Sequence, residues 1–255
     1  SRDLRGQMFI GDRYNSRLRR IDAASGIIQT LATGLDPLGT AVSAAGVLYA
    51  TDGNRNKVWA IDVKTGAQRV VAGTGEPGFS GDGGQATLAR LNYPYDVAVD
   101  AEDNLFISES GNERVRRVDA KTGVITTVLG NGQCDSTGDG GPAVNATVCG
   151  LRGLHLDRSG RLYLAASAHH RVRRIDTDGR ISTVAGNGSS ESSGDGGLAS
   201  AATLNSPHSI VTDNSGNVFI MEADGHRVRR IDIATGLIST IAGTGMRGFS
   251  GDGGL

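Results

Sequence analysis

The residue types that could do chemistry in this sequence are thinly spread. Tyr95, Asp96, Arg152, His155 and His208 lie on short apolar runs that we predict to be β-strands lining one central channel. A histidine near a carboxylate can hold a divalent metal or transfer a proton. However, no nucleophile–base pair and no metal-ligand spacing is recognisable around these five residues. We therefore predict that they form a binding surface, with no catalytic residue, no metal site and no cofactor.

Arginine is the second residue type with chemical potential, because the chain has 23 arginines and only 3 lysines. The arginines gather in runs such as Arg114–Asp119, and a row of guanidinium groups could bind the phosphates of RNA. Each main run ends in an aspartate and most follow an acid on the preceding predicted strand, so cross-strand ion pairs are available. Alternation along a strand also sends Arg116 and Arg117 to opposite faces. We predict structural ion pairs and no nucleic-acid partner.

A glycine-rich tetrapeptide, Gly-Asp-Gly-Gly, occurs at 81–84, 138–141, 194–197 and 251–254. Such loops can bind phosphate, and repeated aspartates can bind calcium. No Lys-Ser/Thr pair follows these glycines, and one aspartate per loop supplies few oxygens for calcium. We predict repeated tight turns whose aspartates accept hydrogen bonds from nearby backbone N–H groups: Asp82, Asp139, Asp195 and Asp252.

The two cysteines, Cys134 and Cys149, fall at the two ends of one of these glycine-rich loops when the loops are aligned. A disulfide there would close the loop and stabilise it by up to about 3 kcal/mol. Two free thiols are the alternative, and no Cys-x-x-Cys spacing suggests zinc or redox chemistry. We predict the disulfide, and with it an oxidising compartment.

Two Asn-x-Ser/Thr sequons, at Asn145 and Asn187, lie in the same class of loop and are candidate N-glycosylation sites. His169, His170 and His226 precede arginine runs at a predicted turn. We interpret these three histidines as turn residues.

The arginine runs and the glycine-rich loops share one period. The runs start at 17, 57, 114, 171 and 227, so that successive starts are 40, 57, 57 and 56 residues apart. The Gly-Asp-Gly-Gly tetrapeptides are 57, 56 and 57 residues apart. The short first step lacks one loop. Two independent markers with one period indicate an array of structural repeats.

Each repeat contains four short runs of strand length, as at Pro94–Asp100, Asn104–Glu109, Arg114–Asp119 and Val124–Leu129. They are rich in β-branched residues and are separated by turn residues. A four-stranded sheet cannot bury both faces alone, but sheets stacked around an axis bury one another. We predict an all-β fold, a β-propeller with about five blades at 1–35, 36–74, 93–130, 149–186 and 206–243. The predicted loops between blades are 75–92, 131–148, 187–205 and 244–255.

The repeat resembles that of the NHL family of β-propellers. The resemblance rests on Asp213–Ile220 with Glu222 and the following His226-Arg227-Val228, and on Asp100–Ile107 with Glu109, Asn112 and Arg114. The long variant with Ser-Gly-Asp-Gly-Gly loops is similar to that of large extracellular NHL proteins. The sequence departs from the pattern at Ala166, where other blades have an acid, and at Lys57-Val58-Trp59-Ala60, which replaces the arginine run. We expect weakened ion pairing in those two blades.

Asp3 aligns with Asp100, Asp157 and Asp213, the last residues of predicted first strands. We therefore expect the first blade to lack its innermost strand. Because most NHL propellers have six blades, we expect a sixth repeat in a longer, multidomain parent chain; a five-bladed closure with a gap is the alternative. The N-terminal residues show no signal peptide, which we attribute to processing or to a fragment.

The composition excludes several classes of function. The formal net charge of −1 gives no overall attraction to nucleic acids or anionic membranes. No stretch approaches the roughly 20 apolar residues of a membrane-spanning helix. We predict a secreted or cell-surface interaction module that binds a protein or glycan through its loops. The alternatives are a propeller hydrolase or lyase with an axial metal, and an RNA-binding propeller.

Overall fold

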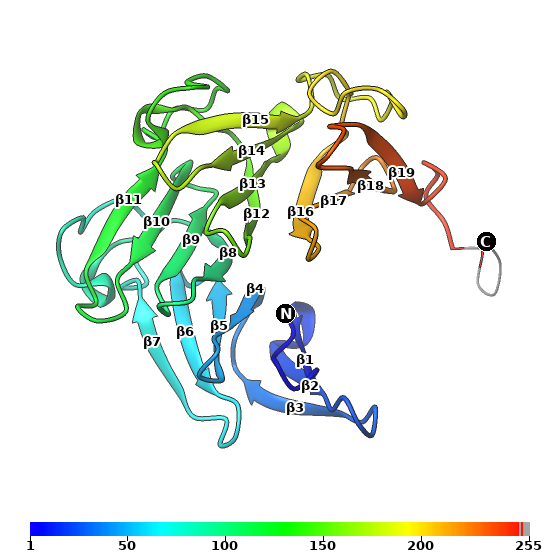
Figure 1. The fold of residues 1–255 in the computed structure, drawn as a ribbon. Helices are drawn as coiled ribbons and strands as arrows, with labels where there is room; N and C mark the ends of the chain where they lie inside the picture. The colour runs from blue at the N-terminus through cyan, green and yellow to red at the C-terminus, as the bar shows by residue number, and fades with distance from the viewer. Residues whose placement is uncertain (250, 252–255) are drawn as a thin grey trace.

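The computed structural model describes residues 1–249 and 251, and these residues form five antiparallel sheets arranged around a common centre (Figure 1). The all-β fold and the five propeller blades are thereby confirmed. Asp252, for which we predicted a turn, lies outside the described residues. Among the described residues, the helices are single turns of three residues, so none could cross a membrane.

The strands follow one another from the centre of each blade to its outside. The first blade contains β1 (Met8–Asp12), β2 (Arg17–Ile21) and β3 (Ile28–Thr33), and the second contains β4 (Pro37–Val42), β5 (Val47–Asp52), β6 (Lys57–Asp62) and β7 (Gln68–Ala72). The third contains β8 (Pro94–Val99), β9 (Leu105–Glu109), β10 (Arg114–Val118) and β11 (Ile125–Leu129). The fourth contains β12 (Leu151–Leu156), β13 (Leu162–Ala166), β14 (Arg171–Ile175) and β15 (Ile181–Ala185). The fifth contains β16 (Pro207–Thr212), β17 (Val218–Glu222), β18 (Arg227–Ile231) and β19 (Ile238–Ala242). Short 3-10 turns η1 (Arg13–Asn15), η2 (Ala86–Leu88), η3 (Ala143–Asn145) and η4 (Ser167–His169) occur in the connections.

The first blade has three strands, as the alignment of Asp3 predicted. Its innermost position is held only by the residues before Asp3, where the N–H of Phe9 donates to the carbonyl of Ser1 at 2.9 Å. Asp3 accepts hydrogen bonds from the N–H groups of two later turn residues, as Asp100 does in the third blade. The first and fifth sheets lie apart on the open side of the ring (Figure 1). A sixth repeat stays a prediction.

The propeller has two chemically different ends. We call the end where the innermost strands begin the loop end; it carries the loops at 12–17, 52–57, 109–114, 166–171 and 222–227. We call the other the turn end. The tight turns that connect the first strand to the second, and the third strand to the fourth, lie at this end of each four-stranded blade. A turn such as Asp119–Gly123 forms because the aspartate accepts hydrogen bonds from two following N–H groups and Gly123 takes a positive φ of 70°.

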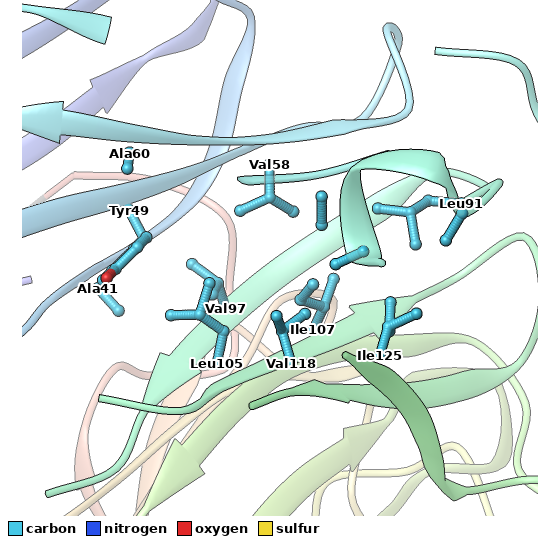
Figure 2. Close-up of a cluster of buried hydrophobic side chains, with 13 residues drawn as sticks. Ala41, Tyr49, Val58, Ala60, Leu91, Val97, Leu105, Ile107, Val118 and Ile125 are labelled. Carbon is cyan, nitrogen blue, oxygen red and sulfur yellow. The ribbon is translucent and has the colours of Figure 1, made fainter. Parts of the chain in front are cut away.

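Neighbouring blades bury their faces against each other. Between the second and third blades, Val58 from β6 meets Val97, Ile107 and Val118 from β8, β9 and β10 (Figure 2). Val58 and Ile107 are completely buried. Burying one such side chain contributes about 1.5–3 kcal/mol. Stacking thus supplies the apolar core that a single four-stranded sheet lacks.

The three long loops between blades fill the outer wedges where the sheets diverge. In the first of them, Gly83 donates to the carbonyl of Ile125 at 2.8 Å, and the N–H of Ile125 donates to Gly84 at 2.9 Å. The loop thereby extends the outer hairpin of the third blade, and the same pairing recurs at Ile181 and Ile238. Gly81 has a φ of +89°, and a Cβ there would lie 2.8 Å from the Cα of Ala89. Only glycine fits this approach.

The aspartates of these loops do not act mainly within their own turns, and this corrects our prediction. The tight turn itself is present, because Gly84 donates to Gly81 at 3.0 Å. The carboxylates instead reach a buried arginine of the next blade. The three ion pairs are Asp82–Arg116 at 2.6 Å, Asp139–Arg173 at 2.6 Å and Asp195–Arg229 at 2.7 Å. Each loop is therefore fixed to the blade that follows it.

The predicted cross-strand pairing of the arginines is confirmed. Arg116 also contacts Glu109 at 3.3 Å on the neighbouring strand, while Arg117, on the opposite face, pairs with Asp119 at 3.3 Å. In the fourth blade Ala166 replaces the acid, and Arg173 bonds instead to the carbonyls of Thr137 and Thr147. The guanidinium groups of Arg116, Arg117 and Arg173 are therefore held by contacts within the propeller.

Candidate binding surface at the loop end

Three of the predicted channel residues come together at the loop end. Tyr95, Arg152 and His208 each occupy the second position of an innermost strand, in β8, β12 and β16. Because these strands pack on one another around the axis, equivalent positions of successive blades lie side by side. The Tyr95 hydroxyl lies 2.7 Å from His208 Nε2, and the Arg152 Cζ lies 4.7 Å from the centre of the Tyr95 ring.

The one charged side chain of this cluster at neutral pH is the Arg152 guanidinium. Burial, and then the nearby Arg152 guanidinium, lower the pKa of His208, so the imidazole is neutral. Burial raises the pKa of Tyr95, so the phenol keeps its proton. Arg152 forms no ion pair with any described residue, and its buried Nε has no hydrogen-bond partner among them. An aromatic ring, a neutral imidazole and a free guanidinium are thus presented together.

The surface extends further than the sequence suggested. Arg13 Nη2 donates to the Tyr93 hydroxyl at 3.1 Å, and the rings of Tyr93 and Tyr95 are 6.5 Å apart. Arg13 also lies 5.8 Å from the centre of the Tyr14 ring, and Tyr14 is 94% exposed. Sequence analysis missed Arg13, Tyr14 and Tyr93. A signal was available, because the chain has only 5 tyrosines and two of these three residues are tyrosines.

Asp96 is next to this cluster in the sequence but is used by the backbone. Its two carboxylate oxygens accept hydrogen bonds at 2.9 Å from the N–H groups of Val97 and Leu154. Burial raises the pKa of Asp96 to about 6, although these two hydrogen bonds oppose the shift. Asp96 therefore connects the third blade to the fourth, and we do not include it in the surface.

His155 does not join the cluster either. It lies three residues beyond Arg152 on β12, towards the turn end, and its Nε2 is 2.8 Å from the Thr212 hydroxyl. Nε2 also accepts from the Thr212 N–H at 3.1 Å, so this nitrogen carries no proton. Within 1–249 and 251, the one group of three metal-ligand side chains is Cys134, Cys149 and His169. The two cysteines of this group are bonded to each other. Neither His155 nor His208 belongs to such a group in this part of the chain.

The predicted disulfide between Cys134 and Cys149 is confirmed, with Cα atoms 4.4 Å apart. His170 is a turn residue as predicted, and its Nδ1 accepts a hydrogen bond from the Ser206 N–H of the next blade at 3.2 Å. Both sequon asparagines are exposed. The Asn187 amide nitrogen donates to Ala201 at 3.2 Å. Glycosylation of Asn145 and Asn187 stays a prediction.

Comparison with known proteins agrees with this architecture. The chain is 26% identical to Teneurin-3 of Danio rerio over 89% of its length and 26% identical to Teneurin-m of Drosophila melanogaster over 93%. It spans only 12% and 10% of those two proteins. The solved structure of virginiamycin B lyase from Staphylococcus aureus superposes with a TM-score of 0.62 and 17% identity, covering 94% of this chain and 68% of the lyase. That identity shows a shared fold alone.

The family described as the Teneurin NHL domain matches residues 4–137 and 187–249, which is more than half of the chain. The match covers the first, second, third and fifth blades, and the strands of the fourth blade lie between its two segments. The chain therefore belongs to the teneurin NHL domain family.

Proposed function

We propose that this propeller is a non-catalytic interaction module of a larger extracellular protein and that it binds a protein partner through its loop end. The observation that carries the proposal is the continuous surface formed by Arg13, Tyr14, Tyr93, Tyr95 and Arg152, together with His208. Tyrosine and arginine dominate the energetics of protein interfaces because they combine apolar area with directional polar groups. Three of the 5 tyrosines of the chain lie on this surface.

The location outside the cell rests on the disulfide, since disulfides persist in oxidising compartments. Membership of the teneurin NHL family supports the same location. The relatives are about ten times longer than the match, which supports a domain within a longer chain. The catalytic alternative has less support, because His155 and His208 lie at different levels of the channel and have separate partners.

Capture of a partner by matched variants tests the proposal. The wild-type chain and the Tyr95→Ala/Arg152→Ala double variant would be immobilised and exposed to extracellular fluid and detergent-solubilised cell surfaces from the source organism. We expect a saturable protein partner to bind the wild type and to lose at least tenfold in affinity for the double variant, because interface anchors of this kind each contribute about 2 kcal/mol or more.

The control is Arg158→Ala, which removes an exposed arginine from a turn at the turn end. This variant should retain full binding. Absence of any saturable protein partner, or equal loss in both variants, would reject the loop end as the interface. Release of the captured partner by glycosidase treatment would assign the interaction to a glycan instead.

A further inference from the structure

The interface between the first and second blades differs from the three that follow it, because the long loop is missing there. A connection of three residues joins β3 to β4. At the later interfaces an isoleucine at the start of the outermost strand is completely buried beneath the loop: Ile125, Ile181 and Ile238. At the same register position the second blade has Gln68, which is exposed.

A second substitution accompanies the missing loop. The position of the buried arginines Arg116, Arg173 and Arg229 is taken in the second blade by Trp59. An arginine there would be buried without the loop aspartate that neutralises it elsewhere, and a buried unpaired charge is costly. The side chains of this interface are thus suited to a wedge with no loop in it.

The open wedge contains a cavity of about 500 Å³ at the turn end. The first blade contributes Gln7 and Arg20 to its lining, and the second contributes Val47, Val63 and Gln68. The size lies within the range of small-ligand sites in proteins, about 300–1,000 Å³. The walls combine apolar side chains with amide groups, which suits a ligand with both a hydrocarbon body and polar substituents.

The charge in this cavity is mainly positive and unpaired. Four basic residues line it, namely Arg5, Arg20, Lys64 and Arg69, and two acidic ones, Asp3 and Asp62. None of the four forms an ion pair with a residue that the structure describes. The two carboxylates already accept hydrogen bonds from the backbone. Asp3 accepts from the N–H groups of Arg5 and Gln7 at 2.9 Å, and Asp62 accepts from the N–H of Lys64 at 2.7 Å.

We propose that this cavity binds a small organic anion, a carboxylate or sulfate group carried on a body of about the size of a disaccharide. Arg5 and Lys64, which are exposed, hold the anionic group, and the apolar walls with Gln68 hold the body. The ligand could be a free small molecule or the terminal unit of a longer acidic glycan. This site is separate from the loop-end surface, so the two proposals stand or fall independently.

Titration calorimetry with a sulfated uronic-acid disaccharide tests the site, with lactose as the neutral counterpart and sodium sulfate as the bare anion. We expect the sulfated disaccharide to bind more tightly than either comparison ligand. The variant Lys64→Gln should weaken its binding roughly tenfold, since a charge-assisted contact is lost. Melting temperature checks that the variant remains folded.

The chain offers a matched control in Lys121→Gln. Lys121 occupies the same Asp-x-Lys-Thr-Gly turn in the third blade, where a long loop covers the wedge. That variant removes the same charge and should change binding less than twofold. Equal weakening by both variants, equal binding of sodium sulfate and the disaccharide, or no binding at millimolar concentrations would overturn the proposal.

A long heparin chain distinguishes the two sources of the ligand. If heparin binds more tightly than the disaccharide and this binding depends on Lys64, the site binds the end of an acidic glycan. If its affinity is no higher, the site holds a free small anion. Lys64-dependent binding of an oligoglutamate peptide without binding of the disaccharide would contradict the proposed ligand class.

Discussion

The recurring arginine of the third strand illustrates how single residues specify this fold. Arg116, Arg173 and Arg229 are completely or almost completely buried. Each forms an ion pair with the aspartate of the long loop that precedes its own blade. The arginine of each pair is buried while the aspartate side chain is 39–50% exposed. Such a pair adds little net stability compared with apolar packing, but removing the aspartate would take a partner from a buried charge, which is destabilising. The pair therefore selects the correct loop position rather than adding to the core.

Asp96 provides a prediction about pH. The folded protein holds the Asp96 proton more tightly than the unfolded chain, because burial raises the pKa from 3.8 to about 6. The unfolding free energy of the wild type relative to the Asp96→Asn variant is therefore greatest below about pH 4, and it declines as the pH rises through 6. Because the side chain is partly exposed, we expect a decline of roughly 2 kcal/mol, measured by urea denaturation at several pH values.

Asp157→Asn is the control of opposite sign. Hydrogen bonds from Arg161 and Ser159 outweigh burial and lower the pKa of Asp157. The wild-type advantage over this variant is present above the unfolded pKa of about 4 and is lost as the pH falls through the folded pKa. For each variant, the difference in unfolding free energy from the wild type would be followed against pH. If the two differences change with pH in the same direction, the raised pKa assigned to Asp96 is wrong.

At the scale of elements, the loops between blades are structural parts of the sheets they join. The loop at 131–148 is held by Asp139–Arg173 on one side and by the Cys134–Cys149 disulfide on the other. The corresponding loop at 187–205 has the ion pair Asp195–Arg229 but no cysteines. The disulfide is therefore an addition to a loop that the repeat already fixes.

Removal of the disulfide tests how much this addition contributes. We expect the Cys134→Ser/Cys149→Ser variant to fold and to lose about 2–3 kcal/mol of unfolding free energy, because the unfolded chain regains the freedom of a 15-residue loop. Chemical denaturation of the two proteins measures this loss. The wild type under reducing conditions is the control and should match the variant; an unchanged denaturation midpoint would contradict the prediction.

At the scale of the whole molecule, each blade depends on its neighbours, and the two outer blades have fewer of them. Ala165 and Val172 of the fourth blade are completely buried, whereas their counterparts in the fifth, Met221 and Val228, are exposed or half-buried. The difference arises because the fourth blade is covered on both faces and the fifth on one (Figure 1). Stability in such an array is a sum of blade and interface contributions.

Hydrogen exchange should reveal this gradient. The strands β14 and β18 have the same sequence, Arg-Val-Arg-Arg-Ile, so differences in the side chains of the strand itself are removed. We expect the amides of β18 to exchange at least tenfold faster than those of β14, because local opening of the fifth blade breaks one interface instead of two. Exchange followed by mass spectrometry of matching peptides measures the ratio, and equal protection would contradict the model of additive blades.

The sequence by itself determined the repeat, the strands and their order, because alternation, turn residues and a constant period are local properties of the chain. It also determined the disulfide and the pairing of Arg116 with Glu109, since both follow from aligning repeats or from adjacent strands. The constant 34-residue separation of the loop aspartates from the buried arginines was equally readable. It could not be interpreted without knowing that each loop folds over the following blade.

Only the tertiary structure decided which side chains share a surface. Tyr95 and His208 lie 113 residues apart and meet because both occupy the second position of an innermost strand, whereas His155 lies at another level of the channel. The cavity beside Gln68 depends on a loop that is missing, and the space left by a missing segment has no signature in local periodicity. Distances between blades are set by how whole sheets stack around the axis, and no single strand contains that information.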